Sequence, residues 1–118
     1  MQRRSLVIFA LLLPSTVMAG ENNPTFGMGG GISTCASFAQ DYASSPKAVE
    51  NDYYEWAEGF MTAMNEAAMA GKRKAVDLTS ISQDAQMMLI RRYCDKHPLA
   101  MYMEAVQDVY ASLQPIHR

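Results

Sequence analysis

The two cysteines are the residues whose chemistry is most clearly defined by this sequence. Cys35 and Cys94 are the only cysteines in the chain. In an exported protein the compartment is oxidising, and two cysteines then form a disulfide by default. A bridge between them would close a loop of about sixty residues, for which loop entropy gives roughly 4 kcal/mol of stabilisation. No Cys-x-x-Cys is present, so a redox pair is the weaker interpretation. We predict a Cys35–Cys94 disulfide.

A second candidate site involves Cys94 and His97, which are three residues apart. At this spacing both could reach one metal ion at the end of a helix, although a zinc site would need two more ligands. The other histidine, His117, lies next to the end of the chain. We therefore expect Cys94 to be disulfide-bonded and His97 to cap a corner between two helices. No metal and no other cofactor is predicted.

The sequence contains no recognisable catalytic motif built from a nucleophile, a base and an orienting group. Glu55, Glu58 and Glu66 are spaced to share one helix face, and a solvated acidic face is a simpler interpretation than an acid–base pair. Glycines at 27 and 29–31 follow no strand pattern and precede no Lys-Ser/Thr, which argues against a phosphate-binding loop. We predict that the protein is not an enzyme.

The first nineteen residues have the three parts of an export signal. Arg3 and Arg4 are followed by an unbroken apolar run at 6–13, which is too short to span a bilayer. Val17 and Ala19 supply small residues at a cleavage site. We predict a signal peptide over residues 1–19, cleavage between Ala19 and Gly20, and a periplasmic location. An uncleaved membrane anchor is the alternative.

The charge of the mature chain limits its partners. Ten basic and twelve acidic side chains give a net charge of −2, and losing Arg3 and Arg4 with the signal leaves −4. A net acidic surface does not attract nucleic acid or anionic membranes. We predict no nucleic-acid partner, no membrane association after signal cleavage, and other proteins as partners. The protein itself is expected to be a monomer or a homodimer.

The mature chain is expected to be one domain with flexible ends. Residues 20–33 contain five glycines, a proline and two asparagines, a composition that favours a disordered leader. Residues 34–114 have helical patterns throughout and form the predicted domain. Residues 115–118 are a short tail.

A central helix from about Ala48 to Ala70 is the strongest pattern in the sequence. Apolar residues recur there at steps of three and four, which is the period of one helix face. Gly59 lies inside this helix, between Trp56 and Phe60, and we predict that another helix crosses closely there. The predicted packing residues of the whole domain are Phe38, Trp56, Gly59, Phe60, Tyr93 and Val106.

Three further helices surround the central one. Thr34 is a predicted N-cap of a first helix, and Ser82 of a third helix that ends near His97. The expected apolar face of the third helix consists of Ala85, Met88, Leu89, Arg92 and Tyr93. Pro98 is predicted to open a fourth helix over residues 99–113. The fold class is therefore all-α, a small four-helix orthogonal bundle crosslinked by one disulfide.

The mature chain is rich in methionine, with eight residues, most of them in predicted helices. Methionine fills irregular cores and is also over-used on promiscuous binding surfaces. We favour a loosely specified core for most of them. Met87, Met101 and Met103 are the candidates for a partner surface.

Several short motifs resemble two families of exported helical proteins. These are Thr34 to Phe38 (TCASF), Trp56 to Phe60 (WAEGF), Asp77 to Thr79 (DLT) and Tyr93 to Pro98 (YCDKHP). They are similar to the Hde family of periplasmic acid-stress chaperones, over about residues 33–113. The run at 56–60 is equally similar to the Tai-type immunity proteins of type VI secretion.

Each resemblance implies a different role for the protein. The first implies an acid-stress chaperone, and acid would then change the charge from −4 to about +11 by reference pKa values. Such a change could dissociate a dimer and expose methionine and aromatic surface around an intact disulfide. The second implies an inhibitor that neutralises one cognate toxin or effector at neutral pH. A structural or interaction protein of another kind is the third possibility.

Overall fold

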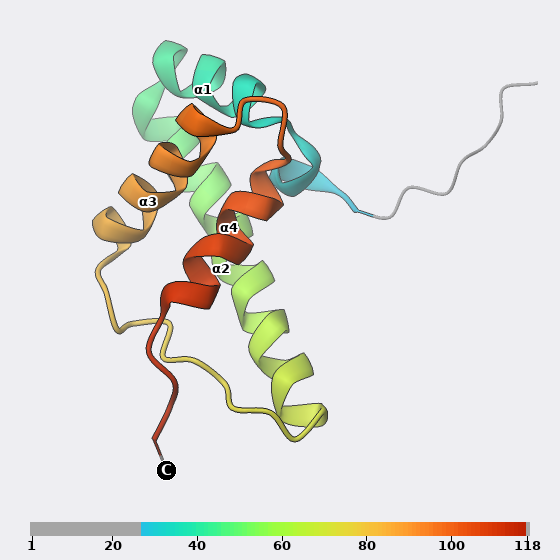
Figure 1. The fold of residues 1–118 in the computed structure, drawn as a ribbon. Helices are drawn as coiled ribbons and strands as arrows, with labels where there is room; N and C mark the ends of the chain where they lie inside the picture. The colour runs from blue at the N-terminus through green and yellow to red at the C-terminus, as the bar shows by residue number, and fades with distance from the viewer. Residues whose placement is uncertain (1–26, 118) are drawn as a thin grey trace, which may run out of the picture.

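Four α-helices and one short 3₁₀ helix make up the computed structural model, which describes residues 27–117. In chain order they are η1 (Gly29–Ile32), α1 (Cys35–Ser44), α2 (Pro46–Ala70), α3 (Gln83–Lys96) and α4 (Tyr102–Ser112) (Figure 1). No β-strand occurs among these described elements. The predicted all-α fold with four helices and one disulfide is confirmed. The predicted signal peptide at 1–19 and the leader residues 20–26 lie outside the described residues.

The beginnings of the helices follow from local chemistry. The Thr34 side chain accepts a hydrogen bond from the backbone N–H of Ser37 at 3.1 Å, and Ser82 accepts one from Ala85 at 3.2 Å. Each cap satisfies a donor that the first turn of a helix leaves unpaired. Pro46 begins α2, where its missing N–H and fixed φ are tolerated. The predicted N-caps Thr34 and Ser82 are confirmed, and α2 begins two residues before the predicted Ala48.

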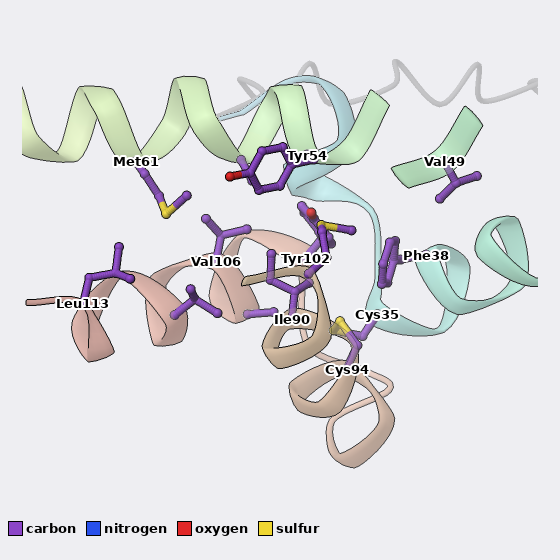
Figure 2. Close-up of a cluster of buried hydrophobic side chains, with 14 residues drawn as sticks. Cys35, Phe38, Val49, Tyr54, Met61, Ile90, Cys94, Tyr102, Val106 and Leu113 are labelled. Carbon is purple, nitrogen blue, oxygen red and sulfur yellow. A yellow bond between two sulfur atoms is a disulfide. The ribbon is translucent and has the colours of Figure 1, made fainter. Parts of the chain in front are cut away.

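The helices enclose a core that lies between α2 on one side and α3 with α4 on the other (Figure 2). α1 lies across one end of the molecule, and residues 71–82 return from the far end of α2 to the start of α3 (Figure 1). α2 packs against η1, α1 and α4, whereas α3 packs mainly against α4 and α1. The central helix therefore packs directly against α1, whereas α3 meets it across the core, where the hydroxyl of Tyr54 donates to Gln86 Oε1 at 3.4 Å.

The predicted disordered leader is wrong for its last residues. Gly29–Ile32 form η1, and Gly31 is buried against α2. Gly29 has a φ of 72°, in the left-handed region that glycine adopts at little steric cost. Glycine favours disorder in an isolated segment, but here its lack of a side chain permits close packing.

The predicted start of the fourth helix at Pro98 is also wrong, because α4 begins at Tyr102. The carbonyls of Pro98 and Ala100 instead accept hydrogen bonds from the N–H groups of Ala36 and Cys35, at 2.9 and 2.8 Å. These are unpaired donors in the first turn of α1. The segment before α4 therefore forms a turn whose carbonyls cap α1.

The third helix has the predicted extent but not the predicted buried face. Its buried residues are Gln86, Met87, Ile90 and Cys94, of which the last three follow at steps of three and four. Because Cys94 must point toward Cys35, the disulfide fixes the rotation of the helix about its axis. Met87 is consequently 0 % exposed, so the prediction that it belongs to a partner surface is wrong. Its neighbour Met88 is 47 % exposed instead.

Candidate protein-binding surface

A disulfide joins the start of α1 to the end of α3. Cys35 and Cys94 are bonded, are 59 residues apart in sequence, and have Cα atoms 4.7 Å apart (Figure 2). Both cysteines are buried. The prediction of this disulfide is confirmed, and the bond indicates an oxidising environment of the kind that exported proteins meet. It also means that Cys94 presents no thiolate to a metal ion beside His97.

An aromatic cluster formed by Phe38, Tyr53, Trp56, Phe60 and Tyr102 lies beside the disulfide. The rings of Phe38 and Tyr102 have centroids 4.9 Å apart, and the edge of Tyr53 meets Tyr102 at 4.8 Å. Trp56 stacks on Phe60 at 4.9 Å. Phe38 and Tyr102 are fully buried, whereas Tyr53, Trp56 and Phe60 are half-buried at the edge of the cluster. Phe38, Trp56 and Phe60 therefore pack where the sequence predicted, as do half-buried Tyr93 and fully buried Val106 on the other helices.

The buried hydroxyl of Tyr102 lies in the middle of this cluster. It donates a hydrogen bond to the backbone carbonyl of Tyr53 at 3.1 Å. Burial raises the pKa of Tyr102 above its ordinary value, and the nearby phenols of Tyr53 and Tyr54 add to the effect. Burial also raises the pKa of Tyr53 and of Tyr54. The cluster is thus held by neutral phenols over the whole acid and neutral range.

The residues of η1 cover the outer edge of the cluster. The indole N–H of Trp56 donates to the carbonyl of Met28 at 3.0 Å. A Cβ added to Gly31 would collide with the ring of Trp56, and one added to Gly30 would lie 3.0 Å from the ring of Tyr53. Glycine composition alone predicts a disordered leader and does not reveal this contact. The available sequence signal was the run of glycines, which permits close packing against a large side chain such as that of the single tryptophan.

Gly59, the predicted crossing point, faces open space. A Cβ added there would have no neighbour within 4 Å outside its own helix. The residue lines an open groove of about 750 Å³ between α2 and residues 78–86, together with Glu55, Glu58 and Thr62. The prediction of a close helix crossing at Gly59 is therefore wrong. The neighbouring Trp56 and Phe60 pack on the other side of the helix.

The opposite end of the molecule is held by two side-chain amides. Asn65 donates to the carbonyl of Val76 and accepts from its N–H, both at 2.9 Å, and also accepts from the hydroxyl of Tyr110 at 2.8 Å. Gln86 donates to the carbonyls of Leu78 and Ile81 at 2.8 and 3.2 Å. Together these bonds fix residues 71–82, which have no helix of their own. Neither amide is among the residues predicted from the sequence.

The carboxylates make their contacts at the surface. Glu50 and Arg91 form the single ion pair found within residues 27–117, with 3.6 Å between Oε1 and Nη1, and both side chains are about one-third exposed. Glu104 accepts from the backbone N–H of Met101 at 2.7 Å, and Asp41 accepts from the hydroxyl of Tyr53 at 3.0 Å. Hydrogen bonds from the side chain and backbone of Thr79 lower the pKa of Asp77.

Apolar side chains remain accessible at several points on the surface. Met101 and Met103, two of the predicted partner residues, are half-buried. Leu99 is 90 % exposed and Met28 is 81 % exposed. These residues lie on the segment before α4, on α4 itself and beside η1, so they leave apolar surface near the disulfide and the aromatic cluster.

Residues 27–117 also lack two features that would indicate other functions. No helix in residues 27–117 has both the length and the hydropathy to cross a membrane. Nor do these residues bring together three or more side chains suited to holding a metal ion. Comparisons with protein-family models, curated proteins and solved structures found no match to this chain.

Proposed function

We propose that this chain is an exported protein that binds other proteins, and that it acts at low pH in the manner of the Hde-type acid-stress chaperones that its motifs resemble. The observation that carries the proposal is the chemistry of the bonds inside the fold. They consist of a disulfide, side-chain amides and neutral tyrosine hydroxyls. None of these groups changes its protonation between pH 7 and pH 2.

The bonds that hold the helices together therefore persist at low pH. Acid denaturation mostly reflects native carboxylates that lose their bonds when they are protonated. In residues 27–117 the carboxylate contacts of Asp41, Glu50, Asp77 and Glu104 lie at the surface, outside the core. Acid then acts mainly on the surface, whose charge changes sign, while the disulfide and the amides continue to hold the helices together.

A change of net charge from −4 to about +11 alters how the protein associates with other proteins. In acid the surface changes from net negative to strongly positive, which disrupts associations that depend on the carboxylates. The accessible apolar surface at Leu99, Met101 and Met103 is then available to partly unfolded proteins. Binding of that kind needs no specific partner, and adaptable methionine side chains suit it.

The test is an aggregation assay on acid-treated proteins. A periplasmic extract is taken to pH 3 and returned to neutral pH, with and without the purified protein, and light scattering is recorded. We expect the protein to suppress scattering at pH 3 while keeping the far-UV circular dichroism of a helical protein. A protein that stays compact at pH 3 and leaves scattering unchanged would contradict the proposal.

A second candidate, an immunity-type inhibitor, is favoured by the groove at Gly59. This groove is open, and Glu55 and Glu58 line it without an ion-pair partner among the described residues. A cognate toxin or effector that presents a lysine or arginine would complement it. In that case binding occurs at pH 7, to one protein.

The two candidates differ in what a pull-down recovers. Retrieval from periplasmic extract at pH 7 of one protein, lost in the Glu55→Gln/Glu58→Gln variant, would favour the inhibitor. Recovery of many proteins at pH 3, unaffected by that variant, would favour the chaperone. Recovery of none at either pH would indicate a structural role.

A further inference from the structure

Residues 27–32 form a short strap over the aromatic cluster, where η1 packs against α2 and α4 but is attached by few polar bonds. Among the described residues, the hydrogen bond from Trp56 Nε1 to the carbonyl of Met28 is the only one that joins the strap to the helices. Its large side chains are not fully buried, because Met28 is 81 % and Ile32 is 40 % exposed. Only Gly31 is buried. Glycine loses more conformational freedom on ordering than any other residue.

The chain is much more firmly held immediately after the strap. The carbonyl of Ser33 accepts from the N–H of Tyr102 at 2.8 Å, and the N–H of Cys35 donates to the carbonyl of Ala100, also at 2.8 Å. The disulfide of Cys35 follows. The strap thus ends at a fixed point, Ser33, immediately before α1.

The surface beneath the strap has the chemistry of a peptide-binding site. Trp56 presents a ring face and one N–H donor, and Tyr53 presents a second ring close to Gly30. In the strap, the backbone carbonyl of Met28 accepts from this N–H, and every polypeptide has such carbonyls. Contact with a backbone and a ring face is largely independent of sequence.

We propose that residues 27–32 are a displaceable strap, and that the surface of Tyr53 and Trp56 beneath it binds an extended segment of an unfolded polypeptide when the strap lifts. The strap is then an internal occupant of the site and competes with the client. This inference rests on the proposed protein-binding function and adds the location of the binding surface.

The first measurement uses the wild-type protein, because Trp56 is its single tryptophan. Hydrogen exchange of the indole N–H is followed by NMR at neutral pH and compared with the amides of Ala57 and Met61 on the buried face of α2. We expect the indole proton to exchange at least tenfold faster and to be insensitive to low denaturant. Equal rates with equal denaturant dependence would overturn the proposal, since the strap would then open only when the protein unfolds.

The second measurement compares Gly31→Val with a matched control, Gly59→Val. The first places a side chain against Trp56, and the second places the same side chain in open space. We expect Gly31→Val to retain helical circular dichroism, to red-shift the emission of Trp56, and to bind reduced, carboxymethylated α-lactalbumin about tenfold more tightly at pH 7 than the wild type. Gly59→Val should match the wild type in emission and binding.

Three results would overturn the inference. They are loss of helicity in Gly31→Val, unchanged binding of α-lactalbumin, and a dimer in Gly31→Val at micromolar concentration, which would mean that the surface takes a second copy. The acid aggregation assay is separate from these measurements. Its failure, combined with tight binding by Gly31→Val at pH 7, would remove the acid-stress role and leave the strap inference intact.

Discussion

The two ends of this small bundle are held together by different chemistry. At the disulfide end, Cys35 and Cys94 join α1 to α3 beside the aromatic cluster. At the amide end, Asn65 and Gln86 hold residues 71–82 against α2 and α3. The first end has helices that can pack on one another. The second has an extended chain whose backbone groups need partners, and the two amides supply some of them, alongside backbone hydrogen bonds to Gln114 and Ile116.

The difference shows how a domain of this size fixes a segment without secondary structure. A covalent bond constrains the unfolded chain, whereas a buried amide acts by pairing groups that would otherwise lose their hydrogen bonds on burial. Neither device depends on charge. The following substitutions test each end separately, from the largest expected effect to the smallest.

Removal of the disulfide has the largest expected effect. In the Cys35→Ser/Cys94→Ser variant, loss of a crosslink spanning 59 residues should lower the free energy of unfolding by about 4 kcal/mol. Urea unfolding followed by circular dichroism measures this. A loss under about 1 kcal/mol would mean that packing alone holds the disulfide end.

Removal of the Asn65 amide should have the next largest effect. Asn65→Ala leaves the N–H and carbonyl of Val76 and the hydroxyl of Tyr110 without their partner. We expect a loss of about 2–3 kcal/mol in the same unfolding experiment. Thr62→Ala is the matched control, because the hydroxyl of Thr62 bonds only to a carbonyl of its own helix, and it should change stability by less than about 0.5 kcal/mol. Equal losses in the two variants would contradict a special role for the amide.

The third test concerns alkaline pH and the aromatic cluster. Because burial raises the pKa of Tyr102, the folded state favours its neutral form. The resulting stability is fully present below the unfolded value near pH 10 and is lost as the pH rises beyond it. Tyr102→Phe should lose about 1 kcal/mol at pH 7 through the missing hydrogen bond, but should show a weaker loss above pH 10.

Tyr93→Phe is the control for this experiment, because Tyr93 lies outside the cluster, beside His97. It should preserve the alkaline loss of the wild type. If Tyr102→Phe and the wild type lose stability in parallel above pH 10, Tyr102 is not the group that titrates.

The smallest expected effect is a gain in stability. Gly59→Ala adds a methyl group where no neighbour lies within 4 Å, inside a helix that favours alanine. We expect the free energy of unfolding to rise by about 0.5–1 kcal/mol. Gly31→Ala should lower it, since its methyl group meets the ring of Trp56. In thermal unfolding, the melting temperature should therefore rise for Gly59→Ala and fall for Gly31→Ala. Shifts in the same direction would contradict the difference in packing between the two glycines.

Local signals were sufficient to predict much of the fold. Thr34 and Ser82 cap helices because their side chains satisfy nearby backbone donors, and Pro46 begins α2 for a similarly local reason. The disulfide followed from the cysteine count and the predicted compartment. The buried face of α3 was also within reach, because a bonded Cys94 places Ile90 and Met87 on the same side of the helix.

The remaining features depend on contacts between distant segments. Pro98 is compatible with a helix start, and only the unpaired donors of α1 show why it does not form one. A glycine inside a helix has the same local properties whether it faces a neighbour or solvent, so Gly59 could not be distinguished in this way from a packing residue. Likewise, the order of Gly29–Ile32 depends on Trp56, more than twenty residues later. The amides of Asn65 and Gln86 carry no sequence pattern that indicates their roles.

The most direct test of the proposed function is the acid aggregation assay, carried out with the wild type and the Cys35→Ser/Cys94→Ser variant side by side. At pH 3 the wild type should keep its helical circular dichroism and suppress light scattering by the extract. The variant should lose much of both, because it lacks the disulfide, which stays intact in acid. A wild type that keeps its helices at pH 3 without reducing the scattering would contradict the proposed function.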